Sequence, residues 1–294
     1  MTDSRHFPSP REGGEKVPSA SEADEGLPRA TTPVVAVESP RSPSSALRAP
    51  SPSGPSAAPD LRGEKEQAEG AQLYRLLAWL SPAYPIGAFS YSHGLEYAIE
   101  EGLVRDRESL RAWIAGVLAN GAGRVDGALF AAAWRAAAVG NEAELDAVTE
   151  LAAAWRGSAE MALESRQQGT SFATITKTAW PDARLDALLA RHDGEIALPV
   201  AVAVAAAWHD IALSAALTGY LHAFAANLVS AAVRAIPLGQ TDGQRALAGL
   251  EADVAEACAR AIAVRSLDDV GGAAPLVDWC SMRHETQYTR LFRS

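Results

Sequence analysis

The pair His284-Glu285 is the part of this chain that comes nearest to a known catalytic pattern. In zinc proteases, the helical pattern His-Glu-x-x-His supplies two imidazole ligands for the metal and a glutamate that acts as general base. Tyr288 occupies the position of the second histidine here, so we reject a zinc-protease site. His209-Asp210, inside an apolar segment, fits either a metal or proton site or a satisfied pair in the interior or at an interface, and the pattern favours the satisfied pair.

Other signatures of catalysis are missing from the sequence. There is no Gly-x-x-x-x-Gly-Lys-[Ser/Thr] phosphate loop, since the Gly-rich segment 116–127 lacks the lysine and follows a helical pattern. No Gly-x-Ser-x-Gly elbow is present. Cys258 and Cys280 lack the spacing of a metal site, and His93 beside Gly94 favours a helix start over a ligand. We therefore predict a protein that is not an enzyme, with no catalytic residue, no cofactor and no metal site.

The C-terminal segment 275–294 keeps an apolar pair, Leu291-Phe292, between Arg290 and Arg293. Two large apolar side chains in this position have little of their own chain left to pack against, so we expect a partner surface to cover them. The alternative, in which the segment folds back onto its own domain, stays open. The segment favours a protein that works by docking.

Two further segments combine a rigid backbone with side chains suited to contacts. Ser81–Glu96 places tyrosine and phenylalanine on a loop stiffened by proline and glycine, which loses little entropy on binding. It is either a docking surface or a rigid turn filled by aromatic side chains. Ile236–Gln244 either presents two glutamines to a partner or is a connector in which Asp242 caps a helix.

The elements that position these segments are expected to be helical. The first helical pattern is set by Leu73, Leu76, Leu77 and Leu80, and Asp106 is the expected N-cap of a later helix. Further helices are expected near 92–101, 106–120, 125–139, 142–165, 167–178, 183–192, 199–235 and 242–265. Alternating strand patterns are nearly absent. We predict an all-α fold, a single compact bundle of about nine or ten helices.

Residues 1–70 differ in composition from the rest of the chain. Eleven of the 17 prolines lie there with eleven serines, and Phe7 is the only aromatic residue. Such a segment cannot bury enough apolar surface to offset its chain entropy, so we expect it to be disordered. The predicted division is a disordered N-terminal extension at 1–70, an all-helical core at 71–274 and a partner-docking segment at 275–294.

Charge and composition narrow the class of protein. The chain has a net charge of −10 and no run of basic residues, so we expect no nucleic-acid partner. Two cysteines and the lack of a signal peptide indicate a reducing, cytoplasmic location. Ile211–Val233 contains no charged residue and is long enough to span a bilayer, but it is rich in alanine. We expect this segment to be a buried helix of a soluble bundle, with no membrane partner.

Three segments, taken in order, resemble the urease accessory protein F family (UreF). Leu77–Glu96 follows the family's opening pattern Leu-x-x-Leu-Ser-Pro-x-x-Pro-x-Gly-x-Phe-Ser-Tyr-Ser-x-Gly-Leu-Glu. Gly239-Gln240 with Gln244 resembles its middle loop, and His284–Ser294 resembles its ending His-Glu…Tyr-x-Arg-Leu-Phe-Arg-Ser. The resemblance covers about residues 72–294 and leaves out the long N-terminal extension.

The resemblance implies a scaffold, dimeric within its complex, that supports nickel insertion into apo-urease. Its partners would be a second accessory protein, called H or D, and the urease maturation GTPase, which carries nickel and which the scaffold would regulate. The tail would contact the H/D protein, and the other two segments would lie near the dimer or GTPase-facing surface. The implied partner-binding residues are Pro85, Gly87, Phe89, Ser90, Tyr91, Gly94, Glu96, Gly239, Gln240, Gln244, His284, Glu285, Tyr288, Arg290, Leu291, Phe292 and Arg293.

Overall fold

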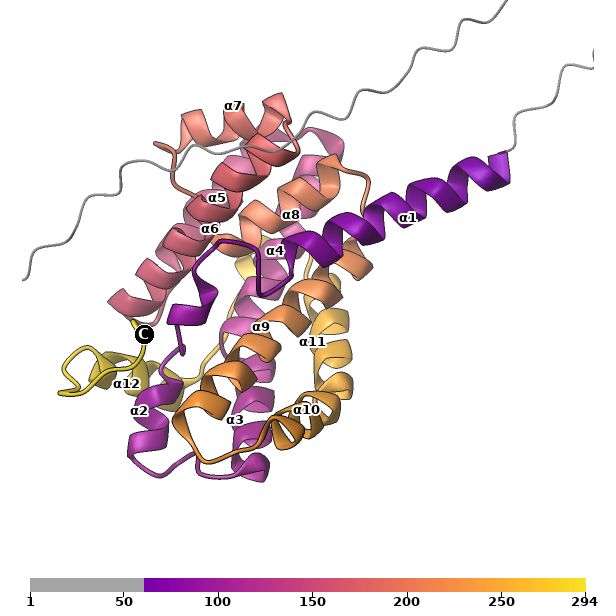
Figure 1. Cartoon of the computed structure of the whole chain (residues 1–294). Helices are drawn as coiled ribbons and strands as arrows, with labels where there is room; N and C mark the ends of the chain where they lie inside the picture. The colour runs from indigo at the N-terminus through magenta and orange to yellow at the C-terminus, as the bar shows by residue number, and fades with distance from the viewer. Residues whose placement is uncertain (1–60) are drawn as a thin grey trace, which may run out of the picture. The chain divides into compact units, whose positions relative to one another are not determined.

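The structure is a computed structural model that describes residues 61–294, the side chains of residues 61 and 62 excepted. Most of the predicted disordered extension therefore lies outside the described residues. Over the described part the chain is all-α, as predicted, with no strand (Figure 1). The helices are α1 (Leu61–Trp79), α2 (Leu95–Glu100), α3 (Arg107–Asn120), α4 (Ala122–Val139), α5 (Glu142–Ala154), α6 (Ala159–Ala179), α7 (Ala183–Arg191), α8 (Leu198–Trp208), α9 (Leu213–Ala235), α10 (Gln240–Gly249), α11 (Glu251–Ala263) and α12 (Pro275–His284), with 3₁₀ turns η1 (Ala88–Ser90) and η2 (Leu267–Asp269).

The described part has twelve α-helices instead of the predicted nine or ten, because two long patterns are interrupted and α12 is not predicted. The expected helices near 142–165 and 167–178 correspond to α5 and α6, but the break between them lies before Ser158, which caps α6. Asp210 adopts a left-handed φ of 59° between α8 and α9, and Leu250 separates α10 from α11. The sequence does not predict α12 because its apolar residues form no stripe along one face.

Helix α1 begins at Leu61, before the expected core boundary at residue 71. Its C-terminal end is packed into the bundle, where Trp79 is buried. Figure 1 shows the rest of α1 extending away from the other helices. Leu73, Tyr74 and Leu77 are exposed, so much of the first apolar pattern faces solvent.

The core forms around α4 and α8, which pack against each other, and α4 also contacts α3, α5, α9 and α11. The α8 segment Pro199–Ala207 is buried throughout and consists mostly of alanine and valine. Small side chains of this kind let neighbouring helices approach closely. The predicted N-cap is confirmed, since Asp106 Oδ1 accepts a hydrogen bond from Ser109 N at 2.8 Å at the start of α3.

Among the helices of residues 61–294, α9 has the length and apolar composition that would allow it to cross a membrane. Half of its most apolar window is buried inside the bundle, through residues such as Leu217, Leu221 and Leu228. The opposite face, with Thr218 and His222, is exposed. One face of α9 therefore packs in the core, and the opposite face is exposed to solvent.

Gly169 on α6 allows a very close approach between two parts of the core. A Cβ atom there would lie 2.1 Å from the carbonyl oxygen of Ile196, which leads into α8. Because backbone atoms must move, we expect Gly169→Ala to lower the free energy of unfolding by roughly 3 kcal/mol. Urea denaturation measures this change.

Gly116→Ala on α3 is the matched control, because no atom lies within 4 Å of its added Cβ. This change should raise the free energy of unfolding by about 0.5–1 kcal/mol, since alanine is the better helix former. Similar effects of the two substitutions would contradict the close approach of α6 to the segment before α8.

Candidate functional site

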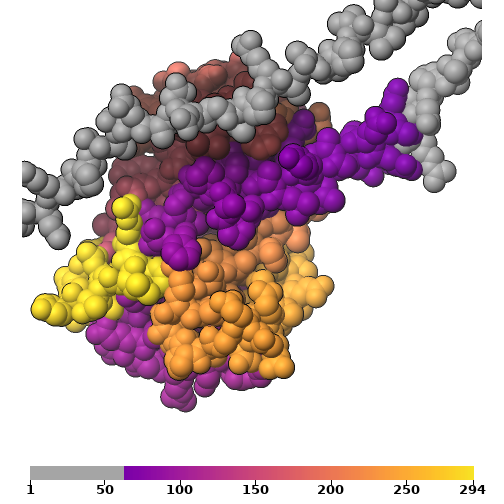
Figure 2. Space-filling view, viewed as in Figure 1, coloured from indigo at the N-terminus to yellow at the C-terminus, as the bar shows by residue number. Residues whose placement is uncertain are grey.

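The first and last sequence motifs lie side by side in the structure (Figures 1 and 2). Arg293 N donates to Ser90 O at 2.8 Å, and Ser92 N donates to Ser294 O at 2.9 Å. These hydrogen bonds join segments that are far apart in the sequence, with 202 positions between Ser92 and Ser294. We call residues 285–294 the tail. The surface that holds the tail is called the cradle and consists of Ser90, Ser92, Glu96, Glu160 and Glu164.

Glu96, in the first turn of α2, holds the backbone of the tail. Its Oε1 accepts a hydrogen bond from Leu291 N at 2.6 Å, and its Oε2 accepts one from Phe292 N at 2.9 Å. A carboxylate that accepts two backbone N–H groups makes charge-assisted hydrogen bonds, which are stronger than neutral ones. Glu96 thereby fixes which way the side chains of the tail point.

His284, the last residue of α12, connects two cradle carboxylates. Its imidazole is fully buried, with Nδ1 at 2.7 Å from Glu160 Oε2 and Nε2 at 2.9 Å from Glu96 Oε2. Glu160 Oε1 also accepts from Arg290 Nη1 at 2.8 Å. Since both ring nitrogens face carboxylate oxygens, the geometry fits an imidazolium that donates on both sides. His284, the histidine of the zinc-protease-like pair, thus joins two carboxylates. We call this contact the His284 clamp.

Ser294 is buried against α6 at the other end of the cradle. Its Oγ donates to Glu164 Oε2 at 2.8 Å, and its carbonyl oxygen also accepts from Ser92 Oγ. Burial alone would raise the pKa of Glu164, but the charge and hydrogen bond of His93, the hydrogen bond from Ser294 and the charge of Arg156 together lower it. Glu164 is therefore an ionised anchor.

The turn before α2 places its backbone against α12. His93 and Gly94 both have left-handed φ angles, of 57° and 76°. A Cβ at position 94 would lie 2.9 Å from Ser281 N, so a glycine suits both the conformation and the contact. His93 Nδ1 lies 3.3 Å from Glu164 Oε2, which agrees with a role at the helix start.

The tail folds back onto its own domain, which the sequence left open, but it does so with one face only. Phe292 and Ser294 point inward, and Phe292 is 5% exposed. Tyr288, Leu291 and Arg293 point outward, and the Leu291 side chain is 62% exposed. The structure therefore separates the apolar pair that the sequence treats as one unit.

Arg234, in the last turn of α9, lies between the first and last motifs. Its guanidinium carbon is 3.6 Å from the ring centroid of Phe89 and 4.5 Å from that of Phe292. Figure 2 shows the three segments meeting on one face of the molecule. The cation therefore covers the buried ring of Phe292 and supports the exposed ring of Phe89.

The other predicted residues of the first motif line a groove beside the tail. Pro85, Gly87, Ser90 and Tyr91 border this groove of about 650 Å³, together with Arg293. The buried Tyr91 donates its hydroxyl hydrogen bond to Gln167 on α6. The segment therefore contains both aromatic side chains that fill the turn and side chains that face solvent.

Within the described residues, no hydrogen bond or ion pair joins the middle loop, Gly239–Gln244, to the tail. Gly239 precedes α10, while Gln240 and Gln244 are exposed. Asp242 does not cap the helix as considered from the sequence. It lies in the first turn instead, where Oδ1 is 3.5 Å from Arg107 Nη1 and 3.2 Å from Arg245 Nη1.

His209 and Asp210 do not form a pair in the interior. Asp210 is exposed because the chain turns between α8 and α9 at this residue. His209 lies 5.4 Å from Trp79 between ring centroids, and burial lowers the pKa of its imidazole. Among residues 61–294, no three histidine, cysteine or carboxylate side chains are grouped so that they would hold a metal ion.

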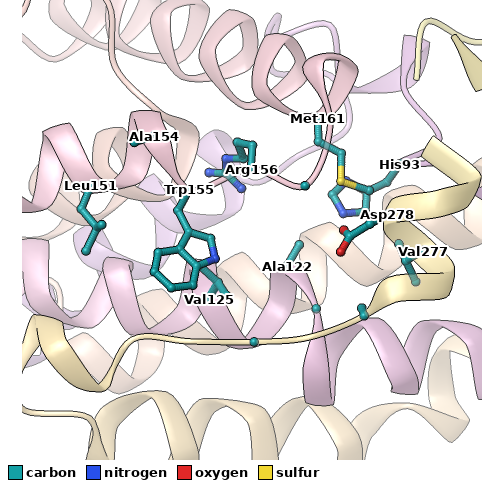
Figure 3. Close-up of a pocket in the computed structure, with 14 residues that line it drawn as sticks. His93, Ala122, Val125, Leu151, Ala154, Trp155, Arg156, Met161, Val277 and Asp278 are labelled. Atoms are coloured by element: carbon teal, nitrogen blue, oxygen red, sulfur yellow. The ribbon is translucent and has the colours of Figure 1, made fainter. Parts of the chain in front are cut away.

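A cavity of about 320 Å³ is lined by His93 and by residues of α4, α5, α6 and α12 (Figure 3). His93 and Asp278 lie next to each other on its wall, and Trp155 and Arg156 line another part. Burial raises the pKa of Asp278, and the charge of His93 opposes this effect. Arg156 is not free, since its Nη1 donates to Asp126 Oδ1 at 2.7 Å.

Sequence reasoning missed the partners of the tail on the bundle. Glu160 and Glu164 lie four residues apart on one face of α6, a spacing that is equally common on solvated helices. Arg234 directly follows the uncharged segment Ile211–Val233, and its position in the sequence predicts no contact. No local signal would have found these residues, because their function depends on contacts with residues distant in the sequence.

The fold and site define a helical protein whose sequence motifs build a surface for contacts and hold its tail. Residues 104–251 match the UreF family. The chain is 58% identical to the urease accessory protein UreF of Granulibacter bethesdensis over 224 residues, which cover 76% of this chain and 94% of that protein. It is 50% identical to the UreF of Rhodopseudomonas palustris strain BisA53 over 79% of this chain and 97% of that protein. The chain belongs to the urease accessory protein UreF family.

The clamp at His284 generates a test of tail anchoring. We expect His284→Gln to release the tail, because the amide carries no positive charge and has both N–H groups on one nitrogen, so it cannot replace two ring nitrogens between Glu96 and Glu160. Hydrogen exchange should show faster exchange at the amides of Leu291 and Phe292. The control Glu285→Gln changes the adjacent exposed residue and should leave both amides protected. Equal protection in both variants would contradict the clamp.

The lowered pKa of Glu164 generates a pH test. Because the folded state favours the ionised carboxylate, its stabilising contribution is complete above the ordinary pKa of about 4.3 and is lost as pH falls through the lowered value. We expect the stability gap between the unmodified chain and Glu164→Gln to shrink between pH 6 and pH 3. Urea unfolding at each pH measures this gap, and a constant gap would contradict the assignment.

Proposed function

We propose that this chain is a non-enzymatic urease maturation scaffold of the cytoplasm. It binds the H/D accessory protein and the urease maturation GTPase, supports nickel insertion into apo-urease and regulates the GTPase. The membership in the UreF family supports a maturation role, because the relatives are named urease accessory proteins. The choice of partners rests on the resemblance of the three motifs.

The seated tail is the observation that carries the proposal. The cradle uses Glu96, His284 and Glu160 to fix the tail, yet leaves Tyr288 and Leu291 fully or largely exposed. An exposed aromatic and aliphatic side chain on an ordered backbone lose little entropy on binding, which suits a docking surface. The H/D protein would contact this outer face of the tail.

The other motifs and the exposed helix faces complete the scaffold. The exposed glutamines of the middle loop, Gln240 and Gln244, would face the GTPase or a second copy of the chain. The exposed apolar residues Leu73, Tyr74 and Leu77 of α1 offer surface for a homodimer within the complex. The sequence has no phosphate loop, so GTP hydrolysis belongs to the partner and nickel is the cargo.

Co-expression with the H/D protein and the GTPase tests the proposal. We expect the full chain to capture both proteins, and Leu291→Asp to weaken capture by about tenfold or more, because a charge replaces an exposed apolar contact. A chain ending at Ser281 should capture neither. Circular dichroism should show that Leu291→Asp keeps the thermal midpoint of the unmodified chain.

Val139→Asp is the matched control, because Val139 is another exposed apolar residue, 78% exposed at the end of α4. It should leave capture unchanged. If Leu291→Asp binds like the unmodified chain, the interface lies elsewhere, at Pro82–Glu96 or Gly239–Gln244. If the unmodified chain captures neither protein, the proposed function is wrong.

A further inference from the structure

Arg234 brings a positive charge to the junction of the tail and the first motif without a recorded carboxylate partner. Its guanidinium forms no ion pair with a carboxylate of residues 61–294. Its Nε donates to the carbonyl oxygen of Ser230 at 3.1 Å, one turn earlier on α9. By contrast, Arg156 and Arg290 each have a carboxylate oxygen within 2.8 Å.

The remaining hydrogen-bonding capacity of Arg234 is unused within residues 61–294. Its Nη2 is buried and has no hydrogen-bond partner. Burial is the only cause that lowers the pKa of this side chain, which agrees with the lack of a nearby carboxylate. The rings of Phe89 and Phe292 attract a cation but carry no formal charge that would neutralise it. A buried donor without an acceptor costs free energy, so its presence calls for an explanation.

The surroundings of Arg234 add charge and exposed apolar area. Arg293 is exposed and also lacks a recorded carboxylate partner, and Phe89 is 64% exposed. We call Phe89, Arg234 and Arg293 the Arg234 patch. The hydrogen bond from Arg293 N to Ser90 O fixes the backbone of Arg293 beside the first motif. The patch thus contains two arginines without an ion pair within residues 61–294, on a chain whose net charge is −10.

We infer that the Arg234 patch binds the carboxylate of an aspartate or glutamate side chain on the protein that docks against the tail. This inference rests on the proposed function and names the chemistry of the partner's contact. A guanidinium is planar and presents its N–H groups in a fixed geometry that matches a carboxylate. The exposed ring of Phe89 adds aromatic surface beside the guanidinium, and aromatic residues and arginine are both enriched at protein interfaces.

The variant Arg234→Met separates this binding role from a structural one. Methionine fills the space between the two rings and removes the buried charge, so the thermal midpoint of the isolated chain should stay the same or rise. Its affinity for purified H/D accessory protein should fall at least tenfold. The affinity of the unmodified chain should decrease more steeply with salt than that of the variant, because salt screens a charged contact.

Arg184→Met is the matched control. Arg184 also lies over an aromatic ring, 5.3 Å from the ring centroid of Trp208, but its charge is balanced by Asp182 at 2.6 Å. This variant should keep the affinity and the salt dependence of the unmodified chain. If Arg234→Met lowers the affinity and Arg184→Met does not, the result supports binding at the Arg234 patch.

Three outcomes would overturn the inference. Equal affinity of Arg234→Met and the unmodified chain would show that the charge does not contact the partner. A lowered thermal midpoint with faster hydrogen exchange at Phe292 would show that Arg234 only holds the tail. If the unmodified chain does not bind the H/D protein at all, the proposed function itself fails, which the first two outcomes leave intact.

Discussion

The imidazole of His284 is held between two glutamates, and the order of the whole tail depends on this contact. Glu96 and Glu160 face it from different helices, and the same carboxylates hold the backbone at Leu291 and Phe292 and the side chain of Arg290. Removal of such groups from water costs free energy that is offset only while all members are paired. The contact therefore couples α2, α6 and α12, and the tail is ordered as one unit.

This coupling gives the helical core its role in function. The close approach of α2 to α12 at Gly94 and the position of α6 beside the core set the spacing of the cradle carboxylates. With the tail seated, Phe292 lies under Arg234, and Leu291 and Arg293 lie on the outer surface. The arrangement thus presents the exposed side chains of the tail on a backbone that is held in one conformation.

The sequence predicts the fold class well because apolar periodicity and capping act within a few residues. The cap at Asp106 follows from such local rules. The helix breaks at Asp210 and Leu250 do not follow from them. The motifs mark the segments that form the candidate site, yet their spacing cannot reveal that the first and last motifs pair with each other. Glu164 and Arg234 escape prediction for the same reason, since their importance arises from contacts across the fold.

The alternation at the end of the tail has a consequence for its register on the bundle. Exposed and buried residues alternate from Leu291 to Ser294, so a shift by one residue against the cradle would exchange the two faces. Glu96 opposes such a shift, because its two carboxylate oxygens accept hydrogen bonds from two consecutive backbone N–H groups, those of Leu291 and Phe292. A single carboxylate thus selects which side chains of the tail lie against the bundle and which face solvent.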